Sequence, residues 1–256
     1  MSLIKTTEEI EKLREGGQKL ATIRDELARR TQTGVSASEL DEIAQKLFRE
    51  AGGVSSFFNF RPRKAKHAYP AHSCVSVNDV VVHGLPSAAV VFKEGDIVGI
   101  DVGMKYRNLF TDTAVTVAVG SIAPEVRRLL ETTEKALAVG IAGVRAGATT
   151  GDIGFAIQDF VKKNGNFGIV RTLGGHGVGH AVHEEPHIPN FGNRGEGEKL
   201  VAGMVIAIEP MLTLGSPELV LDTDGHSFRT KDGSFSAHFE HTVLVTERGA
   251  EVLTMV

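Results

Sequence analysis

Acidic and imidazole side chains recur in four stretches beside glycines and apolar residues, a combination typical of a buried reactive site. These stretches are GIDVGMKYRNLFTDTA (Gly99 to Ala114), GGHGVGHAVHEEP (Gly174 to Pro186), IAIEP (Ile206 to Pro210) and AHFEHT (Ala237 to Thr242). The first stretch places Asp101 and Asp112 inside a strand-like apolar run. Buried carboxylates are rare unless they are paired or bind a metal. The two aspartates are therefore the first candidates for functional residues.

The spacing of Asp101 and Asp112 indicates a β-hairpin. If its turn centres on Tyr106 and Arg107, the two aspartates face each other, with Cβ atoms about 4.5–5.5 Å apart. Carboxylates that close repel each other strongly, and a multivalent cation between them would remove the conflict. The glycines two positions either side of Asp101 would leave room for an ion. The alternative is a hairpin with its acidic face in solvent, because polar-out alternation is common in antiparallel sheets.

Three further side chains extend this candidate metal site. Glu209 and Glu240 each interrupt a run that otherwise reads as a buried strand, and His176 lies between glycines that suit close backbone approach to a ligand. Carboxylates with one imidazole suit Mn²⁺, Fe²⁺, Co²⁺ or Zn²⁺ better than a thiolate zinc site. Five such ligands are more than one ion needs, so we expect two ions roughly 3.5–4 Å apart that acidify a water between them.

The other histidines are expected to be less important. A lone histidine is more often structural than catalytic, and this is the interpretation for His180, His187 and His238. His67 and His72 are expected to lie in loops.

The elements that must position the site are predicted from capping signals and hydrophobic spacing. Helices are expected over 6–30, over 36–52, from Pro124 through Leu137 and over 152–163. Strand-like runs cover 74–77, 80–83, 97–119, 205–214, 219–222, 227–230 and 236–246, and Lys231-Asp232-Gly233 is a candidate hairpin turn. Because no linker divides the chain, the prediction is one α+β domain over residues 1–256.

Composition excludes several classes of protein. The net charge is −4, whereas a nucleic-acid-binding domain normally has an excess of Lys and Arg, so DNA binding is not expected. The single cysteine rules out an intramolecular disulfide framework and fits a reducing compartment. We see no secretory signal and no apolar run approaching the roughly 20 residues that span a bilayer. The expectation is a cytoplasmic protein without membrane association.

The ordered set of motifs resembles the methionine aminopeptidases over nearly the whole chain. It consists of VNDVVVHG with His83, then Asp101 and Asp112, GGHGVG with His176, VHEEP with His183, IEP with Glu209 and FEHT with Glu240. The resemblance implies the duplicated pita-bread fold, a curved antiparallel sheet backed by helices. It also implies removal of the N-terminal methionine from nascent proteins when the second residue is small, through a metal-bridging water or hydroxide that attacks the scissile carbonyl.

The resemblance further assigns each metal ligand a role. Asp101 would chelate one of two divalent ions (Co, Mn, Fe or Zn). Asp112 and Glu240 would bridge both ions. His176 and Glu209 would complete the second. Family members also bind a monovalent cation, Na⁺ or K⁺, and the loop that would hold it here contains Asn78, Val80 and Ser236.

Substrate contacts are also implied by the resemblance. His183 would contact the scissile carbonyl and its tetrahedral intermediate, and His83 would lie near the scissile amide. Glu209 would carry a proton from the metal-bound water to the leaving amine, which makes His83, His183 and Glu209 the catalytic candidates. The substrate-binding set adds the pocket positions Tyr69, Cys74 and His226.

Some details narrow the resemblance and some depart from it. Only 26 positions separate His183 from Glu209, which leaves no room for the helical insertion of type 2 enzymes. With no Cys-rich N-terminal extension, the chain resembles the short, bacterial-style type 1 form. Val182 stands where an aromatic residue is frequent and His226 where a tryptophan is usual. These changes spare the metal ligands but leave the tightness of methionine selection undecided, since hydrophobic pockets discriminate by roughly 1–3 kcal/mol per methylene.

Two other functions remain open. An Xaa-Pro peptidase on the same fold is less favoured, because those enzymes usually carry a large extra domain and there is no room for it before Asp101. A non-catalytic binding protein on this fold is also less favoured, because such relatives lose ligands. We expect a monomer. The basic run from Arg61 to Lys66 is the one local feature suited to transient ribosome contact, although a solvated loop is the simpler interpretation.

Overall fold

A computed structural model describes residues 3–61 and 67–256. Its helices are α1 (Thr7–Arg30), α2 (Ala37–Glu50), α3 (Pro124–Ala142) and α4 (Thr150–Asn164). Its strands are β1 (Val54–Ser55), β2 (Cys74–Val77), β3 (Val80–Val82), β4 (Ile97–Tyr106), β5 (Leu109–Ala118), β6 (Gly168–Ile169), β7 (Gly175–Gly177), β8 (Glu184–Ile188), β9 (Val205–Ile208), β10 (Met211–Thr213), β11 (Leu219–Leu221), β12 (Phe228–Thr230), β13 (Ser236–His238), β14 (Glu240–Val245) and β15 (Ala250–Val252). Arg63, Lys64 and Lys66 of the basic run lie outside the described residues.

Each described helix begins either after a residue whose side chain caps it or at a proline. Thr6 and Ser36 form capping boxes with the glutamates three positions later, as predicted. Pro124 opens α3, where its missing N–H costs no hydrogen bond. Helix α4 begins at Thr150, earlier than predicted, because Thr149 forms a capping box with Asp152. The predicted helices are thus confirmed, with one start shifted.

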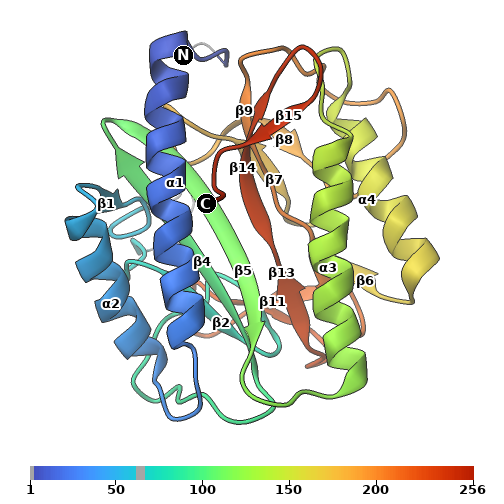
Figure 1. Ribbon diagram of the computed structural model, residues 1–256. Coiled ribbons are helices and arrows are strands. Elements are labelled where there is room, and N and C mark those ends of the chain that lie inside the picture. The colour runs from blue at the N-terminus through green and yellow to red at the C-terminus, as the bar shows by residue number, and fades with distance from the viewer. Residues whose placement is uncertain (1–2, 62–66) are drawn as a thin grey trace.

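Nine strands form a large antiparallel sheet that runs through both halves of the chain. Its order is β1-β4-β5-β14-β9-β7-β8, with β2 added on β4 and β15 on β14. All four helices lie on one side of this sheet, with α1 and α2 over the β4–β5 half and α3 and α4 over the other half (Figure 1). The predicted α+β arrangement, an antiparallel sheet backed by helices, is confirmed.

Two three-stranded sheets complete the fold, in the orders β13-β10-β6 and β11-β12-β3. The run predicted as one strand over 205–214 breaks at Glu209-Pro210, and β9 and β10 belong to different sheets. The run over 236–246 likewise breaks at Phe239. Both candidate glutamates therefore lie where the chain crosses between sheets. The hairpin predicted at Lys231-Asp232-Gly233 is wrong, because β12 pairs with β11 and β3, whereas β13 pairs with β10.

The β4–β5 hairpin turns one position later than predicted. Its two loop residues are Arg107 and Asn108, with φ of 47° and 67°. Positive φ at both central residues defines a type I′ turn, whose twist suits a two-residue hairpin. In this register Asp101 lies opposite Ala114 and Asp112 lies opposite Gly103. The predicted direct opposition of the two aspartates is therefore wrong, although both lie on the same face of the hairpin.

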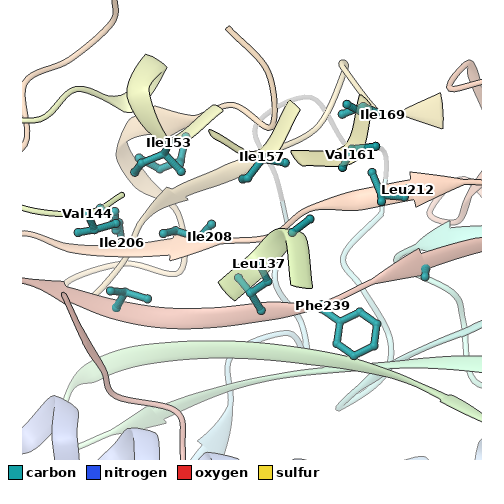
Figure 2. Close-up of a cluster of buried hydrophobic side chains, with 14 of the residues drawn as sticks. Leu137, Val144, Ile153, Ile157, Val161, Ile169, Ile206, Ile208, Leu212 and Phe239 are labelled. Carbon is teal, nitrogen blue, oxygen red and sulfur yellow. The ribbon is translucent and has the colours of Figure 1, made fainter. Parts of the chain in front are cut away.

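Two hydrophobic clusters join the helices to the sheet. In one, Leu137 of α3 and Ile153 and Ile157 of α4 pack with Ile206 and Ile208 of β9 (Figure 2). In the other, α1 and α2 pack on the apolar face of β4, formed by Val98, Ile100 and Val102. These residues alternate with Gly99, Asp101 and Gly103 along β4, so the acidic face of the sheet lies on the side away from the helices. Among the described residues, no helix is both long and apolar enough to span a membrane.

Candidate metal centre and active site

The candidate carboxylates are held by a rigid backbone at the centre of the large sheet. Asp112 on β5 and Glu240 on β14 lie on neighbouring strands, where Glu240 is opposite Ala114. The hydroxyl of Thr242 accepts a hydrogen bond from the Asp112 amide at 2.9 Å and donates one to its carbonyl at 2.7 Å. The hydroxyl of Thr113 donates to the Glu240 carbonyl at 2.8 Å. These bonds fix both carboxylates on one surface.

The acidic face is buried, which excludes the solvent-exposed alternative. Asp101, Asp112 and Glu240 are 8%, 4% and 2% exposed. Burial raises the pKa of Asp101 to about 7, and burial together with repulsion from neighbouring carboxylates raises the pKa of Asp112 and Glu240 well above the ordinary range. Three negative charges this close are unfavourable without a compensating cation.

The donor set fits divalent metal ions. Among the described residues, ligand atoms of Asp112, His176 and Glu240 all lie within 4.8 Å of one another. Asp101 Oδ1 and Glu240 Oε1 are buried and have no hydrogen-bond partner in that part of the chain. Unsatisfied buried oxygens next to an imidazole are what hard or borderline divalent cations coordinate. Asp101, Asp112, His176, Glu209 and Glu240 all line one cavity of about 370 Å³.

His176 is oriented by its own strand. Its Nδ1 donates to the Gly177 carbonyl at 2.9 Å, which leaves Nε2 facing the site, 3.5 Å from Glu209 Oε1. A ligand histidine is commonly oriented in this way through its other ring nitrogen. The flanking glycines also have a packing role. A Cβ on Gly175 or Gly177 would lie 2.1 Å from a backbone oxygen of Ala207 or Glu185, so glycine permits close packing of β7 against β8 and β9.

His238 belongs to the site, although the sequence analysis interpreted it as structural. It is 4% exposed, and its Nε2 lies 3.4 Å from Glu209 Oε2. Its backbone is held by the Thr116 hydroxyl, which accepts from the His238 amide and donates to its carbonyl. One feature of the sequence could have indicated this. His238 is two residues before Glu240 in a strand-like run, and alternate residues of a strand share a face. His176 and His238 thus lie at opposite oxygens of Glu209.

Glu209 differs electrostatically from the other carboxylates. Burial raises its pKa, but a hydrogen bond with the His238 side chain and the electrostatic effect of the neighbouring imidazoles outweigh burial and hold the pKa below its ordinary value. Glu209 therefore stays ionised while its neighbours resist ionisation. A carboxylate in that state can accept a proton.

His83 and His183 line the same cavity. His83 follows β3 with φ of 57°, an uncommon conformation for a residue other than glycine. His183 directly precedes β8, and its ring centroid lies 4.4 Å from that of His176 and 5.4 Å from that of Phe60. Burial lowers the pKa of both His83 and His183 to about 4, so each imidazole is neutral at pH 7.

Part of the cavity wall is apolar and contains the predicted pocket residues Tyr69, Cys74 and His226. Tyr69 donates to the Gly84 carbonyl at 2.8 Å, and the His226 ring packs against it edge-on at 5.5 Å. Cys74 is buried beneath the cavity on β2. Phe57 and Phe60 also line it and were not selected from the sequence. The structure therefore brings the predicted metal, catalytic and pocket residues together.

Comparisons with known proteins agree with this geometry. A model of metallopeptidase family M24 matches residues 11–247. A methionine aminopeptidase of Aquifex aeolicus is 45% identical over 250 residues, which are 96% of each chain. The crystal structure of methionine aminopeptidase from Thermotoga maritima superposes with a TM-score of 0.94 at 40% identity and covers 99% of both chains. The chain belongs to the methionine aminopeptidases of family M24.

Membership in the methionine aminopeptidases confirms the resemblance found in the sequence, the pita-bread fold and the class of enzyme, a metal-dependent aminopeptidase. The match over nearly the full length of both chains agrees with the short type 1 form. A prolidase from Pyrococcus furiosus shares the fold alone, with a TM-score of 0.77 at 23% identity, and this chain covers 66% of it.

The residues predicted to hold a monovalent cation also lie together, outside the cavity of this methionine aminopeptidase. The Ser236 hydroxyl lies 3.2 Å from the carbonyl oxygens of both Asn78 and Val80. Carbonyl and hydroxyl oxygens suit a hard cation.

Of the other histidines, His180 contacts Glu9, His187 is exposed on β8, and His67 and His72 lie in loops as predicted.

Proposed function

We propose that the chain removes N-terminal methionine from nascent proteins whose second residue is small, with two divalent ions held by Asp101, Asp112, His176, Glu209 and Glu240. The observation that carries this proposal is the set of buried, unsatisfied carboxylate oxygens that share a cavity with two neutral histidines. In this proposal Asp101 would hold one ion, His176 and Glu209 would hold the second, and Asp112 and Glu240 would contribute to both.

The chain's own residues divide the work of peptide hydrolysis. When bound, the two ions would acidify a water shared between them, so that it attacks the scissile carbonyl. The ionised Glu209 accepts a proton at the oxygen next to His238 and delivers it to the leaving amine. The neutral His183 donates an N–H to the carbonyl oxygen as charge develops there. His83, which lines the same cavity, lies near the scissile amide.

The apolar end of the cavity selects the substrate. Tyr69, Cys74 and His226 enclose the methionine side chain, whose length suits a deep apolar pocket. The catalytic domain spans residues 1–256 and acts as a cytoplasmic monomer. A sodium or potassium ion at Asn78, Val80 and Ser236 stabilises the loop that precedes His83. Transient ribosome contact belongs to the same proposal, because nascent chains are the substrate.

A metal-reconstitution assay on matched peptides tests the proposal. The metal-free protein is supplied with Mn²⁺, Co²⁺, Fe²⁺ or Zn²⁺ and assayed on Met-Ala-Ser, on Met-Leu-Ser and on an Ala-Pro peptide. We expect release of methionine from Met-Ala-Ser, much less from Met-Leu-Ser and none without metal. Cleavage of the Ala-Pro peptide alone would favour an Xaa-Pro peptidase. No hydrolysis with any of the ions would favour a binding protein.

A further inference from the structure

The turn between β7 and β8 carries part of the cavity wall on a short, irregular segment. Residues 178–183 connect the two strands, and the segment ends at Val182 and His183. Val182 is 5% exposed and packs with Phe57, Tyr69 and Cys74, whereas His183 lines the cavity directly. Since loops are the more mobile parts of a fold, something must hold this turn in place.

Lys5, near the start of the chain, inserts its side chain beneath this turn. Its Nζ lies 2.7 Å from Glu184 Oε2, and the side chain is fully buried, with 0% exposure. The aliphatic part of the Lys5 side chain packs against Gly179, where any larger residue would clash, because a Cβ there would lie 2.3 Å from Lys5 Cε. The Lys5 backbone is itself held, since its amide donates to the Gly203 carbonyl at 2.8 Å. Lysine is rarely buried unless it is paired, so the placement is specific.

Glu184 transmits this contact to the turn. While Oε2 binds Lys5, Oε1 accepts hydrogen bonds from the backbone amides of His180 and Ala181. Glu184 directly follows His183 in the chain, and its side chain closes the turn that precedes this histidine. His183 is therefore held on both sides along the chain. A second contact comes from α1, where His180 Nε2 donates to Glu9 Oε1 at 2.8 Å. Lys5 and Glu9 thus hold the segment at two places, through Glu184 and through His180.

An ion pair of this kind contributes more to position than to stability. The cost of desolvating two buried charges offsets most of their attraction, so such pairs are weak sources of folding energy. They hold a fixed geometry because a displaced partner would be left buried and uncompensated. A displacement of about 1 Å at a catalytic group can lower turnover by about 100-fold.

We propose that Lys5 and Glu184 act as positioning residues for catalysis, by holding His183 against the substrate carbonyl from beneath the β7–β8 turn. The inference rests on the proposed aminopeptidase function. It predicts that neutralising the pair lowers turnover through His183. The metal ligands should stay in place, because they lie outside the β7–β8 turn, on β4, β5, β7 and β14 and between β9 and β10.

The test compares two doubly neutralised variants. Lys5→Met with Glu184→Gln removes both charges but keeps an oxygen for the two turn amides. The matched control, Arg14→Met with Glu251→Gln, removes an ion pair that joins α1 to β15 at 2.5 and 2.7 Å, away from the turn. On Met-Ala-Ser we expect kcat to fall about tenfold for the first variant, with KM and Mn²⁺ affinity changed less than about threefold. The control should retain the kcat of the unmodified protein.

A double-mutant cycle separates positioning from general damage. In a His183→Ala background, neutralising Lys5 and Glu184 should change kcat less than about twofold, because the group they position is already absent. Equal losses in both backgrounds, or an unchanged kcat in a folded variant, would overturn the proposal. If the double variant does not fold, Glu9→Gln, which releases the second contact, takes its place in the same cycle.

Amide hydrogen exchange on the metal-free protein gives a readout independent of activity. The His180 and Ala181 amides should exchange about tenfold faster in the Lys5 and Glu184 variant, and the control should leave them unchanged. If the unmodified protein hydrolyses no methionyl peptide, the proposed function fails. Unchanged exchange of these amides would instead refute the positioning itself.

Discussion

Asp101 and Asp112 lie on the same face of the β4–β5 hairpin but two positions out of register, Asp101 opposite Ala114 and Asp112 opposite Gly103. The offset moves Asp112 along its strand, and the next strand, β14, brings Glu240 opposite the same Ala114. Diagonal neighbours on a sheet are about 7–8 Å apart, wider than a directly opposed pair. The two side chains therefore face the same cavity from diagonal positions and do not lie directly opposite each other.

Metal binding should stabilise the protein, because cations relieve the repulsion among buried carboxylates. At a free Mn²⁺ concentration 100 times the dissociation constant, the free energy of unfolding should rise by about 2.7 kcal/mol. Chemical denaturation with Mn²⁺ and with chelator measures it. Asp112→Asn should lose most of this gain, whereas Asp159→Asn on the exposed face of α4 should keep it. If Mn²⁺ stabilised Asp112→Asn as much as the unmodified protein, Asp112 would not be a metal ligand.

The histidines should differ sharply in importance. His176→Ala should lower kcat/KM at least about 100-fold, because even residues outside the ligand shell cost 10–100-fold. His187→Ala, an exposed position on β8, should lower it less than about threefold. Isothermal titration with Mn²⁺ should show weaker binding for His176→Ala alone. Equal losses in the two variants would mean that the histidines are wrongly assigned.

Substitution of His238 should lower kcat, because His238 acts on the Glu209 carboxylate. His238→Leu removes the ring nitrogen 3.4 Å from Glu209 Oε2, so the carboxylate loses one of its two neighbouring imidazoles. We expect kcat to fall about 10–100-fold, with KM little changed. His238→Gln, which restores an N–H at a similar distance, should recover much of the loss. Steady-state kinetics on Met-Ala-Ser measures both, and a Leu variant as active as the unmodified protein would contradict the role.

Acid should weaken the N-terminal helix at Glu9. Hydrogen bonds from the Thr6 backbone and the His180 side chain lower the pKa of Glu9 to about 2. A folded-state pKa below the unfolded value stabilises the fold above about pH 4.3, and this contribution is lost as the pH falls toward 2.

Urea denaturation between pH 7 and pH 2 measures the contribution of Glu9. Glu9→Gln should cost about 1 kcal/mol at pH 7, because solvent screens the side chain, and nothing near pH 2. Glu42→Gln, at an exposed position on α2, should show no such pH dependence. A Glu9→Gln penalty that persists at pH 2 would show that the capping contact does not depend on charge.

Most of the candidate metal ligands could be predicted from the sequence, because they interrupt local hydrophobic patterns. Asp101, Asp112, Glu209 and Glu240 are charged residues in apolar runs, which is a strictly local signal. The helices were predicted for the same reason, since Thr6 and Ser36 with their glutamates form capping boxes within four residues. Such features need no knowledge of what packs against them.

Tertiary structure alone decided which of these residues meet, and where. The hairpin register depends on the positive φ that Arg107 and Asn108 adopt, and a shift of one position changed the partner of each aspartate. His238 looked structural because its partner, Glu209, lies 29 positions away, at the break between β9 and β10. Lys5 reads as a solvated lysine until the fold places Glu184 beside it, 179 positions later. Contacts between distant segments depend on how sheets pair and cross, and local sequence patterns do not encode that pairing.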